Sequence, residues 1–130
     1  MTTQATQTQI PVITIDGPSG AGKGTIAQLL ASELGFHILD SGSLYRLTAL
    51  ASLNDQIALD DETAMRQVAA QLDVVFKPTD KGLQILLRGE DVSEAIRTEE
   101  IGMRASRVAA ISTVRDALLQ RQRDFLAAPG

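Results

Sequence analysis

A glycine-rich stretch, residues 17–25 (GPSGAGKGT), is the sequence feature that most constrains the fold. It follows a mainly β-branched run at residues 11–15 (PVITI), which is typical of a strand buried on both faces. After it, Ile26, Leu30 and Leu34 recur at helical spacing, and Gly35 stands where a helix commonly ends in a left-handed residue. The pattern predicts a strand, a tight loop and a helix in direct succession, which is how an α/β fold begins.

The residues up to 72 continue this α/β pattern. Residues 36–39 predict a second buried strand that closes at Asp40, and a helix follows from about Ser43. Asp60 can cap a further helix at about 61–72, whose acidic first turn complements the positive end of the helix dipole. Residues 10–72 therefore predict a βαβα unit.

The second half of the chain has a different pattern. Residues 74–76 and 83–87 predict two strands joined by a five-residue turn at 78–82, which is a hairpin inserted into an α/β chain. After Val92 only helical patterns occur, and Ser112 is a plausible cap between two of the helices. We expect four regions: a flexible tail at 1–9, core at 10–72, an insert at 73–111 and a helix at 112–130 that leads back to the core.

Two buried parallel strands cannot form a stable doubly wound sheet, because central strands need neighbours on both edges. We therefore expect residues 1–130 to be the N-terminal portion of a longer protein, with Pro129 and Gly130 leading into a further strand. The predicted fold is α/β, with a parallel sheet flanked by helices and an inserted hairpin and helical region.

Composition excludes several kinds of chemistry. The 130 residues contain no cysteine and one histidine, which removes disulfides, thiolate chemistry and cysteine-ligated metal sites, and we expect no protein metal site. His37 lies in an apolar run and is predicted to be structural. A net charge of −4 disfavours a general nucleic-acid binder, and no apolar run approaches the length that spans a bilayer. We expect neither nucleic acid nor membrane as a partner.

The glycine-rich stretch predicts a phosphate site. It fits the phosphate-loop spacing of a glycine, four residues and Gly22-Lys23, with its hydroxyl residue displaced by one to Thr25. Glycines let the backbone approach phosphate oxygens, and the start of the next helix adds unpaired N–H groups. Lys23 can place its ammonium against the β- and γ-phosphates, while Thr25 can meet a phosphate oxygen or the Mg²⁺ shell. The predicted contacts are Gly17, Pro18, Ser19, Gly20, Ala21, Gly22, Lys23, Gly24 and Thr25.

Other polar residues are ambiguous by themselves. The segment from Asp40 to Ser43 is most simply a turn and helix cap, although ligands of open α/β sheets bind at the ends of strands. Arg46 lies off the apolar face of its helix and can be a solvated charge or an anion contact. Most later arginines are expected on the surface, with at least one exception for a phosphoryl-transfer site: Arg97, Arg104, Arg107, Arg115, Arg121 and Arg123.

Taken together, these segments resemble the bacterial cytidylate (CMP) kinases, among the nucleoside monophosphate kinases. The resemblance extends over about residues 10–130 and is carried by several short motifs. They are residues 13–16 (ITID) leading into GPSGAGKGT, 39–42 (LDSG) with Tyr45-Arg46, 89–93 (GEDVS) with 96–98 (IRT), and Ala105-Ser106 with Val114-Arg115. The resemblance implies a P-loop NTPase type of sheet and transfer of the γ-phosphoryl group of Mg-ATP to CMP or dCMP in pyrimidine nucleotide metabolism.

The resemblance also implies roles for particular residues. Residues 17–25 would hold the ATP phosphates, with Lys23 as the catalytic cation. Ser41 and Arg46 would belong to the monophosphate site, with Arg46 gripping the acceptor phosphate. Ser106 and Arg115 would face the cytosine, and Arg97 is a weaker candidate for substrate binding. A cytoplasmic enzyme that is a monomer at full length is expected.

The family continues into a Gly-Arg-Asp segment, the remaining strands and an arginine-bearing lid, none of which occurs in these residues. We therefore expect the 130 residues alone to have little or no transfer activity. The alternatives are another small-molecule P-loop kinase of adenylate or shikimate kinase type, or a non-catalytic nucleotide-binding module or fragment. The absence of Asp-x-x-G and Asn-Lys-x-Asp elements disfavours a GTPase-like switch.

Overall fold

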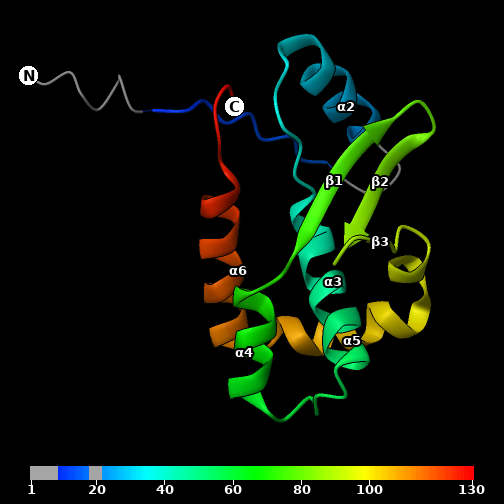
Figure 1. The fold of residues 1–130 in the computed structure, drawn as a ribbon, viewed down its shortest axis with the longest axis vertical. Coiled ribbons are helices and arrows are strands. Elements are labelled where there is room, and N and C mark those ends of the chain that lie inside the picture. Colours follow the sequence, from blue (N-terminus) through cyan, green and yellow to red (C-terminus); the bar gives the residue numbers. More distant parts are fainter. Residues whose placement is uncertain (1–8, 18–21) are drawn as a thin grey trace, which may run out of the picture.

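The protein folds as a group of helices beside a small antiparallel sheet in the computed structural model, which describes residues 9–17 and 22–130 (Figure 1). In chain order the elements are α2 (Lys23–Leu34), α3 (Ser41–Asn54), α4 (Glu62–Ala70), β1 (Val74–Thr79), β2 (Gly82–Leu87), β3 (Glu90–Asp91), the 3-10 helix η1 (Ala95–Arg97), α5 (Glu99–Ala109) and α6 (Ser112–Phe125). The mixed α/β character predicted from the sequence is confirmed.

The predicted hairpin is confirmed, with longer strands and a tighter turn than expected. β1 and β2 pair antiparallel from Val74 opposite Leu87 to Thr79 opposite Gly82, and β3 adds a short third strand to β2. The hydroxyl of Thr79 donates to the Gly82 carbonyl at 2.6 Å, and Gly82 has a φ of 116°, which favours glycine. Pro78 is tolerated because β1 is an edge strand. Pairing therefore continues through most of the predicted turn.

The predicted strands at 11–15 and 36–39 are not strands in the structure. Val12 is 64% exposed and Ile13 is 52% exposed, and neither segment belongs to the sheet that the described residues form. The N–H group of His37 donates to the carbonyl of Gly130 at 2.7 Å, so the second segment lies beside the last described residues. β-branched sequence alone does not make a strand, since a strand is stabilised by pairing with its neighbours. The sheet of the described residues is antiparallel throughout.

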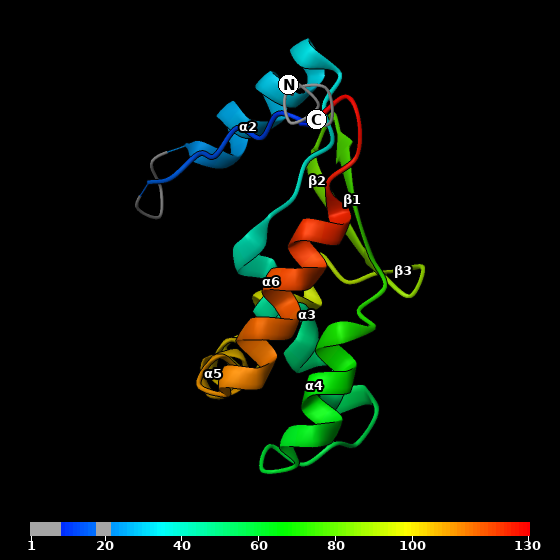
Figure 2. The ribbon, with the colours of Figure 1, turned by 90° about the vertical axis from the view of Figure 1, so that its left-hand side faces the viewer.

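The core lies between α3, α4, α5, α6 and the hairpin. Its fully buried side chains include Leu47 of α3, Met65 of α4, Val108 of α5 and Leu118 of α6, all at 0% exposure. α5 packs across α3, and α4 packs along α6, as Figures 1 and 2 both show. Met65 is a core residue, and Phe125 packs against the core while partly buried.

The end of α2 at Gly35 and the cap of α3 at Asp40 are confirmed as predicted. Gly35 ends α2 with a φ of 67°, and its N–H group donates to the Ala31 carbonyl. Asp40 caps α3, where its carboxylate accepts from the backbone N–H of Ser43 at 3.4 Å and from the Ser43 hydroxyl at 2.7 Å. The interpretation of residues 40–43 as a helix cap is therefore correct.

Two predicted caps are wrong by one residue. α4 is capped by Asp61 rather than Asp60, because a turn from Ala58 to Asp61 brings the Asp61 carboxylate to the N–H of Ala64 at 3.1 Å. α6 has Ile111 at its N-cap with no side-chain hydrogen bond there, so Ser112 is its first helical residue and not its cap.

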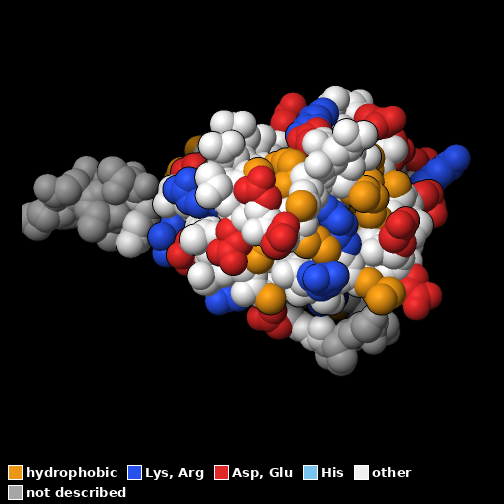
Figure 3. Space-filling view, turned by 90° about the horizontal axis from the view of Figure 1, so that it is seen from below, with side chains coloured by type: hydrophobic (Ala, Val, Ile, Leu, Met, Phe, Trp, Pro, Cys, Tyr) orange, Lys and Arg blue, Asp and Glu red, His pale blue; other side chains and the backbone are white. Residues whose placement is uncertain are grey.

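α2 stands away from the other helices, near the tip of the hairpin (Figure 2). Ala31 is its buried residue, whereas Ile26, Leu29 and Leu34 are 49%, 62% and 46% exposed. The face seen in Figure 3 mixes acidic, basic and apolar side chains and is not dominated by charges of one sign. Within the described ranges, every helix is too short or too polar to cross a lipid bilayer.

Candidate active site

The start of α2 carries exposed polar residues. Gly22 holds the N-cap position with a φ of 81° and, being a glycine, supplies no side-chain cap to the first turn of the helix. Lys23 and Thr25 are exposed in that turn. Uncapped N–H groups and the helix dipole make such a turn favourable for negative charge. Of the predicted loop, Gly17 and residues 22–25 are described, whereas Pro18, Ser19, Gly20 and Ala21 lie outside the described residues.

Ser41 and Arg46 are both carried by α3. Ser41 is exposed in its first turn, directly after the capping residue Asp40. Arg46 is partly buried further along the helix, and its Nη1 donates to the Ile96 carbonyl of η1 at 2.8 Å. The Arg46 side chain therefore reaches from α3 to η1, the segment before α5, and does not extend into solvent.

Arg46 and Ser106 meet at one residue of α5. The guanidinium of Arg46 lies against Gly102 so closely that a Cβ there would be 3.1 Å from both Nη atoms. The hydroxyl of Ser106 donates to the Gly102 carbonyl at 3.3 Å. The two residues come from sequence positions 60 apart (106 − 46), and the packing of α5 on α3 brings each of them to Gly102.

Arg97 and Arg115 lie near opposite ends of α5, on the elements that precede and follow it. Arg97 is the last residue of η1, exposed, and follows the Ile96 that accepts from Arg46. Arg115 is exposed on α6, and its Nη1 donates to the Ala109 carbonyl at the end of α5, at 2.8 Å. Within the described residues, no hydrogen bond links Lys23 or Ser41 to this group around α5.

Two later arginines expected on the surface are partly buried structural contacts. Arg104 of α5 donates from Nε to the Ser52 hydroxyl at 3.1 Å and from Nη2 to the Ile57 carbonyl at 2.7 Å. Arg121 of α6 donates from Nε to the Leu72 carbonyl at 2.9 Å. Ser52, like Thr48, is a buried hydroxyl in a mainly apolar stretch of α3. Nothing in the sequence identified the arginine that would meet it.

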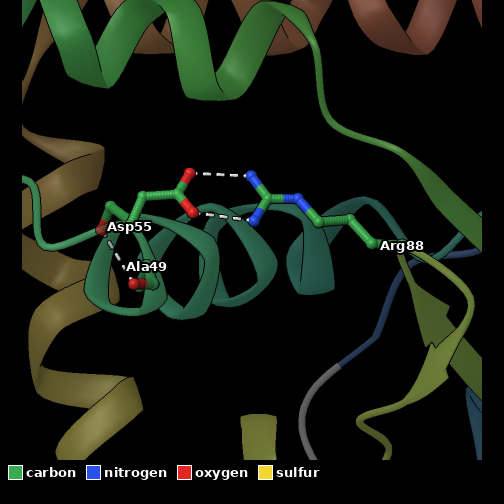
Figure 4. A network of polar contacts seen from close by, with 4 residues as sticks. Ala49, Asp55 and Arg88 are labelled. Carbon is green, nitrogen blue, oxygen red and sulfur yellow. Dashed lines mark hydrogen bonds and ion pairs between the residues drawn. The ribbon is translucent and has the colours of Figure 1, made fainter.

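The perturbed ionisable groups lie outside this cluster. A bidentate pairing with Arg88 lowers the pKa of Asp55, and the same pair raises the pKa of Arg88 (Figure 4). Hydrogen bonds from the backbone N–H and hydroxyl of Ser93 lower the pKa of Asp91. Among the described residues, no cluster of acidic or histidine side chains could hold a metal ion. The cluster around α5 consists of the cationic side chains of Arg46, Arg97 and Arg115 and the hydroxyl of Ser106.

The sequence profile described as "Cytidylate kinase" matches residues 13–130. A cytidylate kinase of Aeromonas hydrophila is 58% identical over 120 residues, which cover 92% of this chain and 52% of that protein. Cytidylate kinases of Pseudomonas aeruginosa and Colwellia psychrerythraea are 57% and 54% identical, over 93% and 95% of this chain. The chain spans about half the length of these relatives, 52% to 55%.

The profile match takes in the phosphate loop, all of α3 and the whole group around α5. The relatives are also identical to this chain at more than half of the aligned residues, over nearly its entire length. These residues therefore belong to the cytidylate kinase family.

Proposed function

We propose that the intact protein transfers the γ-phosphoryl group of ATP to CMP or dCMP, giving ADP and CDP or dCDP. The observation that carries this proposal is the family match over residues 13–130, which includes every residue predicted to contact a nucleotide. We propose an ATP:(d)CMP phosphotransferase rather than a binding module, since the family match covers Lys23, which would serve a donor, and Arg46, which would serve an acceptor.

On the donor side, residues 17–25 would hold the phosphates of ATP. The glycine N-cap of α2 and the exposed Lys23 and Thr25 fit a polyphosphate and its Mg²⁺. Mg²⁺, bound with ATP, would neutralise charge on the phosphates. Lys23 would stabilise the negative charge that spreads over the transferring group, and Thr25 would meet a phosphate oxygen or the ion's shell.

On the acceptor side, Arg46 would bind the phosphate of CMP, with Ser41 nearby on the same helix. Its Nη1 is engaged by the Ile96 carbonyl, which leaves the other guanidinium donors for a phosphate. Ser106 and Arg115 would face the cytosine, and Arg97 is a weaker candidate at the end of η1. Polar groups matched to one base discriminate against another, because the wrong base leaves buried donors unpaired.

We further propose that residues 11–15 and 36–39 are central strands of a parallel P-loop sheet in the intact enzyme. In the same proposal, residues 10–72 belong to the core, 73–111 to a monophosphate-binding insert and 112–130 to a helix that returns to the core. The hydrogen bond from the His37 N–H group to the Gly130 carbonyl joins the 10–72 region to the end of the 112–130 segment, which supports the return of that segment to the core. We propose a cytoplasmic, monomeric enzyme of pyrimidine nucleotide metabolism.

A steady-state assay tests the function directly. The intact protein is given Mg-ATP with CMP, dCMP, UMP, AMP or shikimate, and ADP formation is followed for each acceptor. The proposal expects the largest kcat/KM with CMP or dCMP. A preference for AMP or shikimate would replace it with an adenylate or shikimate kinase type of activity, and binding of ATP without any transfer would indicate a non-catalytic nucleotide module.

A further inference from the structure

Two arginines tie α3 and the η1–α5 segment together in opposite directions. Arg46 leaves α3 and donates to the Ile96 carbonyl of η1, at 2.8 Å. Arg104 leaves α5 and donates to Ser52 of α3, at 3.1 Å, and to Ile57 just beyond α3, at 2.7 Å. Each element thus supplies one arginine and one set of acceptors to the other. We call these contacts the arginine clasp.

The Arg104 half of the clasp has a fully buried acceptor residue. Its hydroxyl acceptor, Ser52, is 0% exposed, and the Ser52 hydroxyl also donates to the Ala49 carbonyl at 2.8 Å. Ile101 and Ala105, one on each side of Arg104 along the helix, are buried against the core. A guanidinium with two acceptors on a buried surface has one favoured geometry, because its donors form a planar fork.

We infer that Arg104 is a positioning residue for the acceptor nucleotide. The inference rests on the proposed function, in which Arg46 of α3 binds the phosphate and Ser106 of α5 faces the base. A single nucleotide would then bridge the two helices, and its affinity would depend on how α5 is placed along α3. Arg104 stands between Gly102, which contacts Arg46, and Ser106 in the sequence of α5, and its hydrogen bonds to Ser52 and Ile57 would fix that placement.

Loosening the clasp should change the KM for the acceptor nucleotide but not the KM for ATP. Neither α3 nor α5 contributes a residue to the loop predicted to hold ATP, so loosening the clasp should leave the KM for ATP unchanged. A misplaced contact raises the KM for the acceptor when the interaction is made equally in the ground state and the transition state. A residue important only for overall stability would show no such split between the two substrates.

The test compares Arg104→Met with Arg107→Met in the intact protein. Methionine keeps much of the aliphatic length of arginine and removes its donors, and Arg107 is an exposed arginine on the same helix. For Arg104→Met we expect a KM for CMP raised about threefold to tenfold, with kcat and the KM for ATP changed less than about twofold. Arg107→Met should match the wild type in all three constants.

Hydrogen exchange of residues 55–61 and 99–109 records whether the clasp has opened. Faster exchange in Arg104→Met together with an unchanged KM for CMP would overturn the inference while leaving the proposed function intact. A wild-type protein that does not phosphorylate CMP would overturn both. Arg104→Lys serves if the methionine variant fails to fold: it keeps the charge but not the fork, and an unchanged KM for CMP in that variant also contradicts the positioning role.

Discussion

Arg88 and Asp55, 33 residues apart in the chain, are joined by two parallel hydrogen bonds, Nη1 to Oδ1 at 2.9 Å and Nη2 to Oδ2 at 2.8 Å (Figure 4). The pair connects the residue after β2 to the C-cap of α3. Arg88 has a φ of 52°, an unusual value for a residue with a side chain. The side chains are 49% and 35% exposed, so solvent screens much of their attraction.

This pair predicts a pH dependence of stability. Arg88 lowers the pKa of Asp55, so the pair stabilises the folded state above the unfolded pKa, which is about 3.9. The contribution is lost as the pH falls through the lower folded pKa. Urea unfolding at pH 6 and pH 3 should therefore show a smaller loss of stability in Asp55→Asn than in the wild type. Asp91, whose pKa is lowered by Ser93, remains in both proteins, and equal losses would contradict the prediction.

The buried face of α6 predicts a large difference between two adjacent leucines. Leu118 is 0% exposed and Leu119 is 47% exposed. Leu118→Ala should lower the free energy of unfolding by about 2–5 kcal/mol, because it leaves a cavity in the core. Leu119→Ala, the matched control, should change it by less than about 1 kcal/mol. Similar values for the two variants in urea titrations would mean that α6 packs by another face.

The predicted role of Lys23 is tested by its removal. In the intact protein, Lys23→Ala should lower kcat about 10²-fold to 10³-fold, on the scale of losing one preorganised contact to the transferring charge. Lys81→Ala, in the exposed turn between β1 and β2, is the matched control and should leave kcat unchanged. Unchanged turnover in Lys23→Ala would remove this ammonium from the mechanism.

The predicted role of Arg46 is tested by a substitution that keeps its charge. Arg46→Lys loses the fork that contacts Ile96 and, in our proposal, the acceptor phosphate. We expect kcat/KM for CMP to fall about tenfold or more, since a hydrogen bond to a charged group contributes about 1.5–3 kcal/mol. Arg66→Lys, an exposed position on α4, should have no effect. If kcat/KM is equal in the two variants, Arg46 does not bind the acceptor.

Residues 1–130 by themselves are predicted to have little or no transfer activity. Residues 11–15, which lead into the phosphate loop, are not paired in a sheet, and Val12 and Ile13 are more than half exposed. A loop without a fixed strand behind it cannot hold phosphates with the preorganisation that transfer requires. Single-turnover measurements with Mg-ATP and CMP check this, and robust transfer by these residues alone would refute it.

Local signals in the sequence predicted the helical parts well. Gly35 ends α2 and Asp40 caps α3 because each of these features depends on residues a few positions away. The cap of α4 was assigned to Asp60, since two neighbouring aspartates satisfy the same pattern and only the preceding turn selects Asp61. The length of the hairpin depended on the Thr79 to Gly82 contact, which composition does not reveal.

Long-range contacts could not be predicted from the sequence alone. The strand prediction at residues 11–15 rested on β-branched residues, but a strand also needs a neighbour to pair with. Arg46 and Ser106 were singled out by resemblance, and only the packing of α5 on α3 explains why they meet at Gly102. Arg104 resembled a surface charge because its acceptors, Ser52 and Ile57, lie about fifty residues earlier in the chain.

Transfer of a labelled phosphoryl group tests the central claim most directly. The intact protein is incubated with Mg-ATP labelled at the γ-phosphate and with CMP, and the nucleotides are separated. The account predicts that the label leaves ATP and is recovered in the β-position of CDP, in a yield that depends on CMP. Label that remains in ATP, or that is released only as inorganic phosphate, would contradict it.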